Sequence, residues 1–425
     1  MKPGAAGAAL VLSAGFYGSL AAVRCFGRAG IPVTVADQSR IGPASWSRFT
    51  KERLLCPTEQ EPDAIIDWLE TFGRTHARHM LYATSDEMAF LMSQERERLG
   101  RVFDLYVPDV SAIYGLLNKR QLSDHARAVG IDTPRSWFPK DAGDLEQVSA
   151  EAHFPVLVKP VTQILFRSHR KGAHVESREA LRDAYESIAQ ERYAERLLAF
   201  DASVKNPSVQ EYLPEAIESI YNLSGFIDEG GEGFIASATL KVLQRPRRLG
   251  VGVCFTTAEV DEDLAAKLRA LCRRVGYHGV FEAEFIRAGG KSLLIDFNPR
   301  FFGQMGFDIA RGVPLPLMAF HGARGDKAAL AQSLREAKVS RRDDVHYVHR
   351  MALEVMLRAQ RLSGALSQPE WEKWQQFSDG SRIPVVDAVL DSDDVRPAAI
   401  EMAHQLYGYA RHPRAFLRHL VLNKG

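Results

Sequence analysis

The sequence has few cysteines and no excess of charge of either sign. Its four cysteines (Cys25, Cys56, Cys254 and Cys272) form no CxxC pair and have no nearby histidine at zinc spacing. This pattern argues against a disulfide framework or a zinc site and indicates buried thiols in a reducing compartment. The 54 Lys and Arg residues balance the 53 Asp and Glu residues, which leaves a formal net charge of +1. Such a balance argues against a disordered polyelectrolyte and against a basic surface that wraps nucleic acid.

Long uncharged runs are also missing, apart from one near the N-terminus. No residue between Lys2 and Arg24 is charged, and this run is long enough to resemble a signal peptide or a membrane span. It contains four glycines and few leucines, however, so its transfer into lipid is unfavourable. The run also divides into a strand at 8–13, a glycine-containing turn and a helix ending at Ala29. We therefore expect a cytoplasmic protein with no stable membrane insertion.

The 425 residues are enough for two to four domains, and the first 115 alternate expected strands with expected helices. This alternation is typical of an open, mostly parallel sheet with helices on both faces. The expected strands are 8–13, 31–37, 53–57, 79–85 and 102–109, and the expected helices end at 29 or span 62–76 and 86–99. The sequence therefore predicts an α/β fold that begins with a Rossmann-like domain.

A mixed region follows this first domain. A helix is expected at 119–129, and residues 263–275 have the apolar period of an amphipathic helix. The expected strands are 155–160, 209–214, 222–227, 233–244, 279–286 and 292–298. The last 85 residues are expected to form helices and linkers, without a recognisable motif.

The segment GVFEAEFIRAGGKSLLIDFNPRFFGQ carries the clearest chemistry. Alternate residues of a strand share a face, so Glu282 and Glu284 lie together, as do Asp296 and Asn298 on the next strand. If the connection between the strands has an odd number of residues, the two polar faces coincide. Carboxylate and amide oxygens of this kind suit Mg²⁺, which prefers a few carboxylates together with substrate phosphates. The alternative is a solvated hairpin face.

The segment resembles the metal-binding end of the ATP-grasp superfamily, where a Glu on one strand is followed by Glu-x-Asn-Pro-Arg on the next. Here the run is IDFNPR, with Asp296 in place of the second Glu. FPVLVKP resembles the family's strand with an ATP-contacting lysine, here Lys159, and LLNKRQLSDHARAVGIDTP resembles the segment with an earlier lysine, here Lys119. VQEYLPE resembles the hinge strand. Together these motifs are most similar to the carbamoyl-phosphate-synthase-like group of carboxylate–amine ligases, which includes D-aspartate ligase-like proteins.

The resemblance implies ATP and Mg²⁺ as cofactors, with Mn²⁺ as an alternative metal, and it implies a role for each matching residue. The metal ligands are Glu284, Asp296 and Asn298, while a ligand role for Glu282 stays open. The residues that contact ATP are Lys119, Lys159 and Lys171 at the phosphates, Glu211, Tyr212 and Leu213 at the adenine, and Glu218 (or Glu215) at the ribose.

Basic residues outside these motifs are the remaining candidates. Arg300 is expected to stabilise the transferring phosphoryl group or the acyl phosphate. Lys241 and Arg245 are expected to contact phosphate or the substrate carboxylate, whereas Arg247 and Arg248 are not. Lys171 belongs to a basic loop with Arg167 and Arg170, which either covers the phosphates or is simply solvated. No residue is singled out as a general base.

The resemblance also implies the architecture and the reaction. We expect a Rossmann-like pre-ATP-grasp domain at 1–115, two α+β subdomains at 116–210 and 211–330 that clamp ATP, and a C-terminal helical extension at 331–425. The implied reaction is ATP-dependent ligation of a carboxylate to an amine through an acyl phosphate, with release of ADP and phosphate. The implied partners are small molecules, with an amino acid on at least one side, and not nucleic acid; a homodimer is an open alternative.

Two other functional classes compete with this interpretation. LSAGFYGS, followed by Asp37 at the end of the next strand, resembles an imperfect dinucleotide fingerprint of the form SxGxxG, in which Ser13 replaces the first glycine. It would indicate an NAD-dependent oxidoreductase. The second alternative is a non-catalytic ATP-binding protein. Biotin-dependent carboxylation ranks lower, because the sequence has no motif of a carrier lysine.

Overall fold

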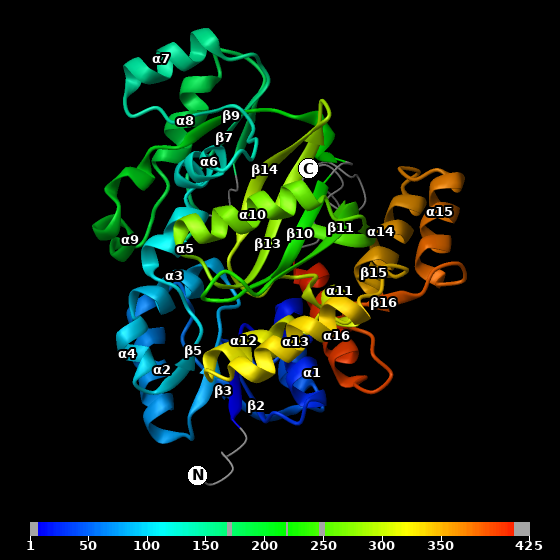
Figure 1. The fold of residues 1–425 in the computed structure, drawn as a ribbon. Helices are drawn as coiled ribbons and strands as arrows, with labels where there is room; N and C mark the ends of the chain where they lie inside the picture. Colours follow the sequence, from blue (N-terminus) through cyan, green and yellow to red (C-terminus); the bar gives the residue numbers. More distant parts are fainter. Residues whose placement is uncertain (1–6, 168–171, 218–219, 246–250, 412–425) are drawn as a thin grey trace.

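The computed structural model describes residues 7–167, 172–217, 220–245 and 251–411 (Figure 1). Within these residues the chain forms three sheets of five, four and seven strands. The four-stranded sheet lies at one end of the molecule, the five-stranded sheet at the other, and the seven-stranded sheet between them (Figure 1). Among the described helices, none is long and apolar enough to cross a bilayer.

The five-stranded sheet confirms the predicted N-terminal domain. All its neighbouring strands run parallel, in the order β3-β2-β1-β4-β5. The strands are β1 (Ala8–Leu12), β2 (Val33–Asp37), β3 (Thr50–Leu55), β4 (His79–Leu81) and β5 (Phe103–Leu105). The helices are α1 (Tyr17–Arg28), α2 (Pro62–Thr75), α3 (Asp86–Gln94) and α4 (Arg96–Gly100). The last two replace the single helix expected at 86–99.

The residues of β1 show why this sheet needs helices on both faces. Leu10 and Leu12 belong to one core with residues of α2 and α3, whereas Ala9 and Val11 belong to a second core with residues of α1. A strand that is apolar at every position is buried on both sides, as parallel sheets require. The carboxyl ends of these strands form one edge, which borders the site described below.

The four-stranded sheet is antiparallel, in the order β6-β9-β7-β8. Its strands are β6 (Ser136–Trp137), β7 (Val156–Lys159), β8 (Ala173–Val175) and β9 (Ser208–Glu211), and the nearby helices are α5 (Val110–Leu117), α6 (Lys119–Ala128), α7 (Ala142–Glu151), α8 (Leu181–Ala189) and α9 (Glu195–Phe200). Side chains of α7 and α8 share one small core with β7, β8 and β9. The sequence did not predict α5.

The seven-stranded sheet has the order β14-β13-β10-β11-β12-β15-β16. Its strands are β10 (Ile220–Ile227), β11 (Phe234–Arg245), β12 (Val251–Ala258), β13 (Gly279–Ala288), β14 (Lys291–Asn298), β15 (His346–Val348) and β16 (Val385–Asp387). The predicted amphipathic helix is α10 (Glu262–Val275), whose first turn is capped by Asp261 and which ends at Gly276 in the left-handed conformation. Its buried leucines share a core with Phe281, Phe285 and Phe297 of the sheet. The opposite face of β13 and β14 carries Glu282, Glu284, Asp296 and Asn298 and with them the site.

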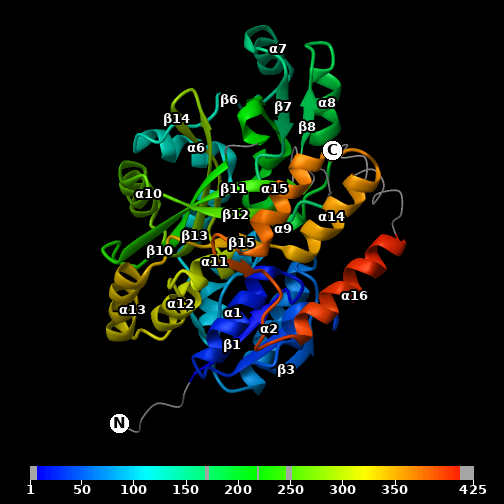
Figure 2. The ribbon, with the colours of Figure 1, turned by 90° about the vertical axis from the view of Figure 1, so that its right-hand side faces the viewer.

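The C-terminal part is more than the predicted helical extension. It contains α13 (Lys327–Ser340), α14 (Arg350–Leu362), α15 (Gln368–Asp379) and α16 (Arg396–Arg411), after the shorter α11 (Met305–Ala310) and α12 (Leu315–Ala323). However, β15 and β16 also extend the seven-stranded sheet at its edge. Figure 2 shows α14, α15 and α16 along one side of the molecule. Three-residue strands are too short to show the alternation by which a strand is recognised in a sequence.

A buried ion pair fastens this C-terminal part to the N-terminal domain. Asp394 accepts hydrogen bonds from Arg24 Nε (2.9 Å), Ser47 Oγ (2.7 Å) and the backbone N–H of Arg48 (2.8 Å). Arg24 and Asp394 are both buried. Two residues 370 positions apart are therefore joined by a buried charge pair. Loss of either partner would leave the other charge buried without its hydrogen-bonded counter-charge, which destabilises the fold.

Candidate functional site

The β13–β14 hairpin places the predicted acidic residues on one face, although not through an odd-numbered connection. The turn has two residues, Gly289 and Gly290, whose positive φ angles of 55° and 74° are favourable for glycine. Continued without interruption, this register would pair Glu284 with Ile295. A β-bulge instead leaves Ile295 as an extra residue, so that Glu284 lies opposite Asp296. The bulge therefore restores the parity that the metal-site prediction needs.

Two lysines contact the paired carboxylates. Lys241, on β11, lies with its Nζ 2.9 Å from Glu284 Oε2, and Lys119, at the start of α6, lies with its Nζ 3.6 Å from Asp296 Oδ1. Burial disfavours the charged form of Lys241, but the nearby Glu284, Glu282 and Asp296 outweigh burial and raise its pKa. The site therefore stabilises positive charge beside two carboxylates from neighbouring strands.

Glu282 lies deeper than Glu284 and is 3% exposed. It accepts hydrogen bonds from Asn298 Nδ2 (3.0 Å) and from the side-chain amide of Gln304. Burial raises its pKa to about 8, and the neighbouring Glu284 adds to the shift, while Lys241 opposes it. Glu282 thus holds the Asn298 amide in one orientation.

Arg300 joins this hairpin to the N-terminal domain. Its Nη2 donates to Asn298 Oδ1 (2.8 Å), and its Nε donates to Asp86 Oδ1 (2.5 Å) at the start of α3. Burial disfavours the charge on Arg300, but Asp86 more than compensates, so its pKa is raised. The guanidinium is therefore fixed between a predicted metal ligand and the edge of the five-stranded sheet.

Lys159, the last residue of β7, reaches the same region from the four-stranded sheet. Its Nζ donates to Gln210 Oε1 (2.9 Å). Burial lowers the pKa of Lys159 to about 8, and the positive charge of Lys119 lowers it further, whereas Asp296 opposes both effects. The backbone N–H of Lys119 donates to the carbonyl of Val161 just after β7 (2.7 Å), which links the two lysine-bearing segments.

The hinge segment 209–215 begins within β9, and its residue Glu211 already forms hydrogen bonds within the protein. The backbone N–H of Glu211 donates to the carbonyl of Arg135 (2.9 Å), and its side chain accepts from the Arg135 N–H (2.7 Å). Tyr212 packs edge-on against His174, with ring centroids 4.7 Å apart. The contacts predicted from Glu211, Tyr212 and Leu213 to an adenine stay predictions.

Several predicted residues lie outside the described part of the chain. Lys171, Arg170, Glu218, Arg247 and Arg248 are among them. Arg245 ends β11, but its side chain is not described. The roles given to these residues stay predictions.

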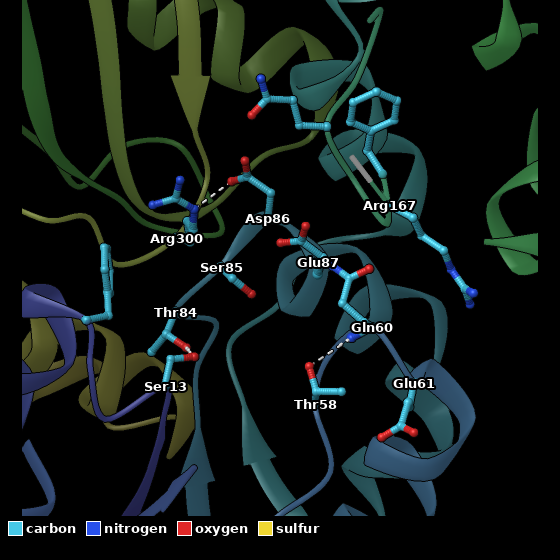
Figure 3. Close-up of a pocket in the computed structure, with 13 residues that line it drawn as sticks. Ser13, Thr58, Gln60, Glu61, Thr84, Ser85, Asp86, Glu87, Arg167 and Arg300 are labelled. Carbon is cyan, nitrogen blue, oxygen red and sulfur yellow. Dashed lines mark hydrogen bonds and ion pairs between the residues drawn. The ribbon is translucent and has the colours of Figure 1, made fainter. Parts of the chain in front are cut away.

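A cleft of about 1120 Å³ lies beside Arg300, between the carboxyl edge of the five-stranded sheet and the residues that follow β7 (Figure 3). Hydroxyl groups, carboxylates, two phenylalanines and two arginines line it, from Ser13, Phe16, Thr58, Gln60, Glu61, Thr84, Ser85, Asp86, Glu87, Gln163, Phe166, Arg167 and Arg300. Its size is in the range of small-molecule sites. The cleft was not predicted from the sequence, because its lining comes from distant segments.

The glycine-containing segment after β1 has a packing role at Gly18, in the first turn of α1. A Cβ atom at Gly18 would lie 2.5 Å from the carbonyl oxygen of Phe302, so glycine is required where α1 meets the segment after β14. Ser13 has a positive φ of 56°, and its hydroxyl donates to Glu59 (3.1 Å). Asp37 accepts a hydrogen bond from the N–H of Ser39 within a turn (2.8 Å). A carboxylate beside Ser13 disfavours a dinucleotide pyrophosphate at this position.

The oxygen atoms of the hairpin fit a hard divalent cation. Glu284 and Asp296 are neighbours on adjacent strands, and each is already in contact with a positive charge. The Asn298 oxygen accepts from Arg300 and keeps a second lone pair. Across the described residues, no group of three or more His, Cys, Asp and Glu side chains is arranged to hold a metal ion. The hairpin therefore offers oxygens from two carboxylates and an amide, a type of donor that Mg²⁺ accepts together with phosphates, and their role as metal ligands stays a prediction.

Sequence reasoning missed several members of this network. Asp86 contacts Arg300 from 214 positions away, so no local signal marks it, whereas Gln304, which contacts Glu282, ends the hairpin segment quoted above but belongs to no motif in it. Gln210 could have been noticed, because it lies within the hinge motif and shares a sheet with Lys159. Glu87 follows Asp86 in an acidic pair at a helix start, a pattern that usually indicates only favourable helix electrostatics.

Comparison with known proteins finds one curated relative and several solved structures. No family profile matches the chain. The sequence is 21% identical, over 277 residues, to the D-aspartate ligase of Enterococcus faecium, in a match that covers 61% of this chain and 63% of that protein. The chain thus spans less than two thirds of the length of this curated relative.

Solved structures are similar over most of the chain. The biotin carboxylase domain of Hydrogenobacter thermophilus 2-oxoglutarate carboxylase, in complex with MgADP, has a TM-score of 0.58 at 15% identity and covers 74% of this chain and 69% of its own. N5-carboxyaminoimidazole synthetase of Staphylococcus aureus scores 0.55 at 13% identity (75% and 77%), and L-amino acid ligase of Bacillus licheniformis scores 0.54 at 13% (76% and 75%). With its parallel N-terminal sheet and the two sheets that meet at the lysines and the acidic hairpin, the chain has the ATP-grasp fold.

Proposed function

We propose that this protein is an ATP-dependent carboxylate–amine ligase that forms an amide through an acyl phosphate and releases ADP and phosphate. The observation that carries the proposal is the meeting of three segments at one point. Lys159 comes from the four-stranded sheet, Lys119 from α6, and Glu284 and Asp296 from the seven-stranded sheet. Cations beside a paired-carboxylate site are what a nucleoside triphosphate and its metal need.

The comparisons support the same class of reaction. The relative in Enterococcus faecium is a D-aspartate ligase, and one structural neighbour is an L-amino acid ligase. Another neighbour was solved with MgADP. We infer that the cofactors are ATP and Mg²⁺ and that the substrates are a small carboxylate and an amine, with an amino acid on at least one side.

The residues of the chain would then act by position and charge. Lys159 and Lys119 would neutralise phosphate oxygens, while Glu284, Asp296 and Asn298 would hold Mg²⁺. Bound Mg²⁺ would neutralise charge on the β- and γ-phosphates. The other residues of the site orient these groups through the hydrogen bonds described above.

Two bond changes follow in this reaction. A substrate carboxylate oxygen attacks the γ-phosphorus, the bond to the β-phosphate oxygen breaks, and ADP leaves. The amine nitrogen then attacks the acyl carbon. The bond between that carbon and the phosphate oxygen breaks, phosphate leaves with its electron pair, and the nitrogen loses a proton. Arg300 borders the cleft and would stabilise negative charge on the transferring phosphoryl group or on the acyl phosphate.

Hydroxylamine gives the direct test. In place of the amine it should intercept the acyl phosphate as a hydroxamate, which iron(III) makes visible, with one ADP and one phosphate for each hydroxamate. The carboxylate panel should contain the common amino acids in both enantiomers, simple dicarboxylates and bicarbonate. Formation of AMP and pyrophosphate would replace the acyl-phosphate mechanism by adenylation. Turnover of NAD without ATP would refute the proposed function altogether.

A further inference from the structure

The cleft beside Arg300 contains a carboxylate, Glu87, that forms no ion pair among the residues that the structure describes. Glu87, in the first turn of α3, faces the open space of the cleft (Figure 3). Its neighbour Asp86 is paired with Arg300, but within the described chain Glu87 forms no ion pair with a lysine, arginine or histidine. A half-buried carboxylate without a cation is costly, and such a side chain is suited to a charged ligand.

A second carboxylate supports Glu87 from behind. Glu59 accepts hydrogen bonds from Ser13 Oγ (3.1 Å) and Ser85 Oγ (2.6 Å), which are neutral donors. Burial raises the pKa of both carboxyl groups, that of Glu87 to about 7, although Arg300 acts in the opposite direction on each. Glu59, Asp86 and Glu87 thus lie close together, and Arg300 forms its ion pair with Asp86 among them.

The position of this charge relative to the acidic hairpin determines what it can bind. Arg300 donates to Asn298 on one side and to Asp86 on the other, and so lies between the hairpin and the start of α3, which carries Glu87. A smaller recess of about 310 Å³, lined by Glu59 and Glu87, continues the cleft. A ligand group bound there is separated from the reacting phosphate by the Asp86–Arg300 pair.

We propose that this end of the cleft binds a positively charged group of a substrate, remote from its reacting atom. One substrate would therefore carry an ammonium or guanidinium group, as a diamino acid or an arginine-like compound does. Glu87 contacts that group directly, and Glu59 supports it electrostatically. This inference rests on the proposed function, because the ligase reaction is what places the reacting atoms on the other side of Arg300.

Lysine and norleucine form a matched pair of probes, since they differ in the terminal amino group. Calorimetric titration of each enantiomer into the ADP-bound protein should show clear binding of lysine and much weaker binding of norleucine. Loss of one charge-assisted hydrogen bond corresponds to about 10- to 150-fold in affinity. Glu87→Gln should therefore weaken lysine binding by a factor in this range and leave the affinity for norleucine unchanged.

Two further variants control for folding and for general charge. Glu59→Gln should weaken lysine binding in the same direction and serves if Glu87→Gln unfolds. Glu97→Gln removes an exposed carboxylate of α4 that does not line the cleft and should change neither affinity. Equal affinities of the wild-type protein for lysine and norleucine would overturn the proposal. Lysine binding that is unaffected in both Glu87→Gln and Glu59→Gln would overturn it as well.

The outcome is separable from that of the proposed function. Absence of hydroxamate with every carboxylate, together with selective binding of lysine, would refute the ligase reaction and keep the cation site. Hydroxamate formation with equal binding of lysine and norleucine would keep the ligase and refute the cation site.

Discussion

Replacing Lys159 by methionine tests the predicted ATP site at a lysine whose pKa is lowered by burial. Methionine keeps most of the apolar stem and removes the ammonium group that donates to Gln210. A charge-assisted hydrogen bond to phosphate contributes about 1.5–3 kcal/mol. We therefore expect the Kd for ATP to rise about 10- to 150-fold in Lys159→Met, since about 1.4 kcal/mol corresponds to a factor of ten.

The pH dependence gives the same site a second signature. With a pKa of about 8 in the free protein, Lys159 binds phosphate as a cation below that pH and must take up a proton above it. At pH 9 about one molecule in ten carries the charge, so wild-type affinity should fall about tenfold between pH 7 and 9. Lys159→Met has no such group and should show no corresponding decline.

Isothermal titration in two buffers of different ionisation enthalpy measures the affinity and the proton uptake together. Lys119→Met is the matched control, because it removes the neighbouring positive charge that lowers the pKa of Lys159. In that variant the decline in affinity should move to higher pH. An unchanged ATP affinity in Lys159→Met would refute the reasoning, as would equal proton uptake by wild type and Lys159→Met.

Three other substitutions test the metal site and the packing. Asp296→Asn should keep the fold by circular dichroism yet reduce ADP formation about 10²-fold or more, because a charge beside the transferring phosphate is lost; normal turnover would remove Asp296 from the site. Asp394→Ala leaves the buried Arg24 with the more distant Asp391 (3.9 Å) in place of its hydrogen-bonded partner and should cost about 3 kcal/mol in urea unfolding, whereas a loss below 1 kcal/mol would contradict the buried pair. Gly18→Ala forces a Cβ against the Phe302 carbonyl and should cost about 1–3 kcal/mol, seen as a lower Tm; an unchanged Tm would show that the segment moves freely.

The polar and apolar faces of the hairpin could be predicted from the sequence, because side chains alternate along a strand. Phe281 and Phe297 are buried in the core under α10, and Glu284 lies on the other face with Asp296. The relative register of the two strands could not be predicted, since it depends on the bulge at Ile295. A single extra residue reverses which side chains face each other, and local sequence does not specify where it occurs.

Periodicity and caps determined the longer elements of this protein, such as α10 with Asp261 before it and Gly276 after it. They also determined the parallel N-terminal sheet, because strands that are apolar at every position require cover on both faces. Only the tertiary structure decided that Asp86 holds Arg300 from 214 positions away and that Glu87 beside them forms no ion pair within the described part of the chain. Such pairings depend on how separate domains pack, and the energy of a charge depends on what surrounds it in space rather than in sequence.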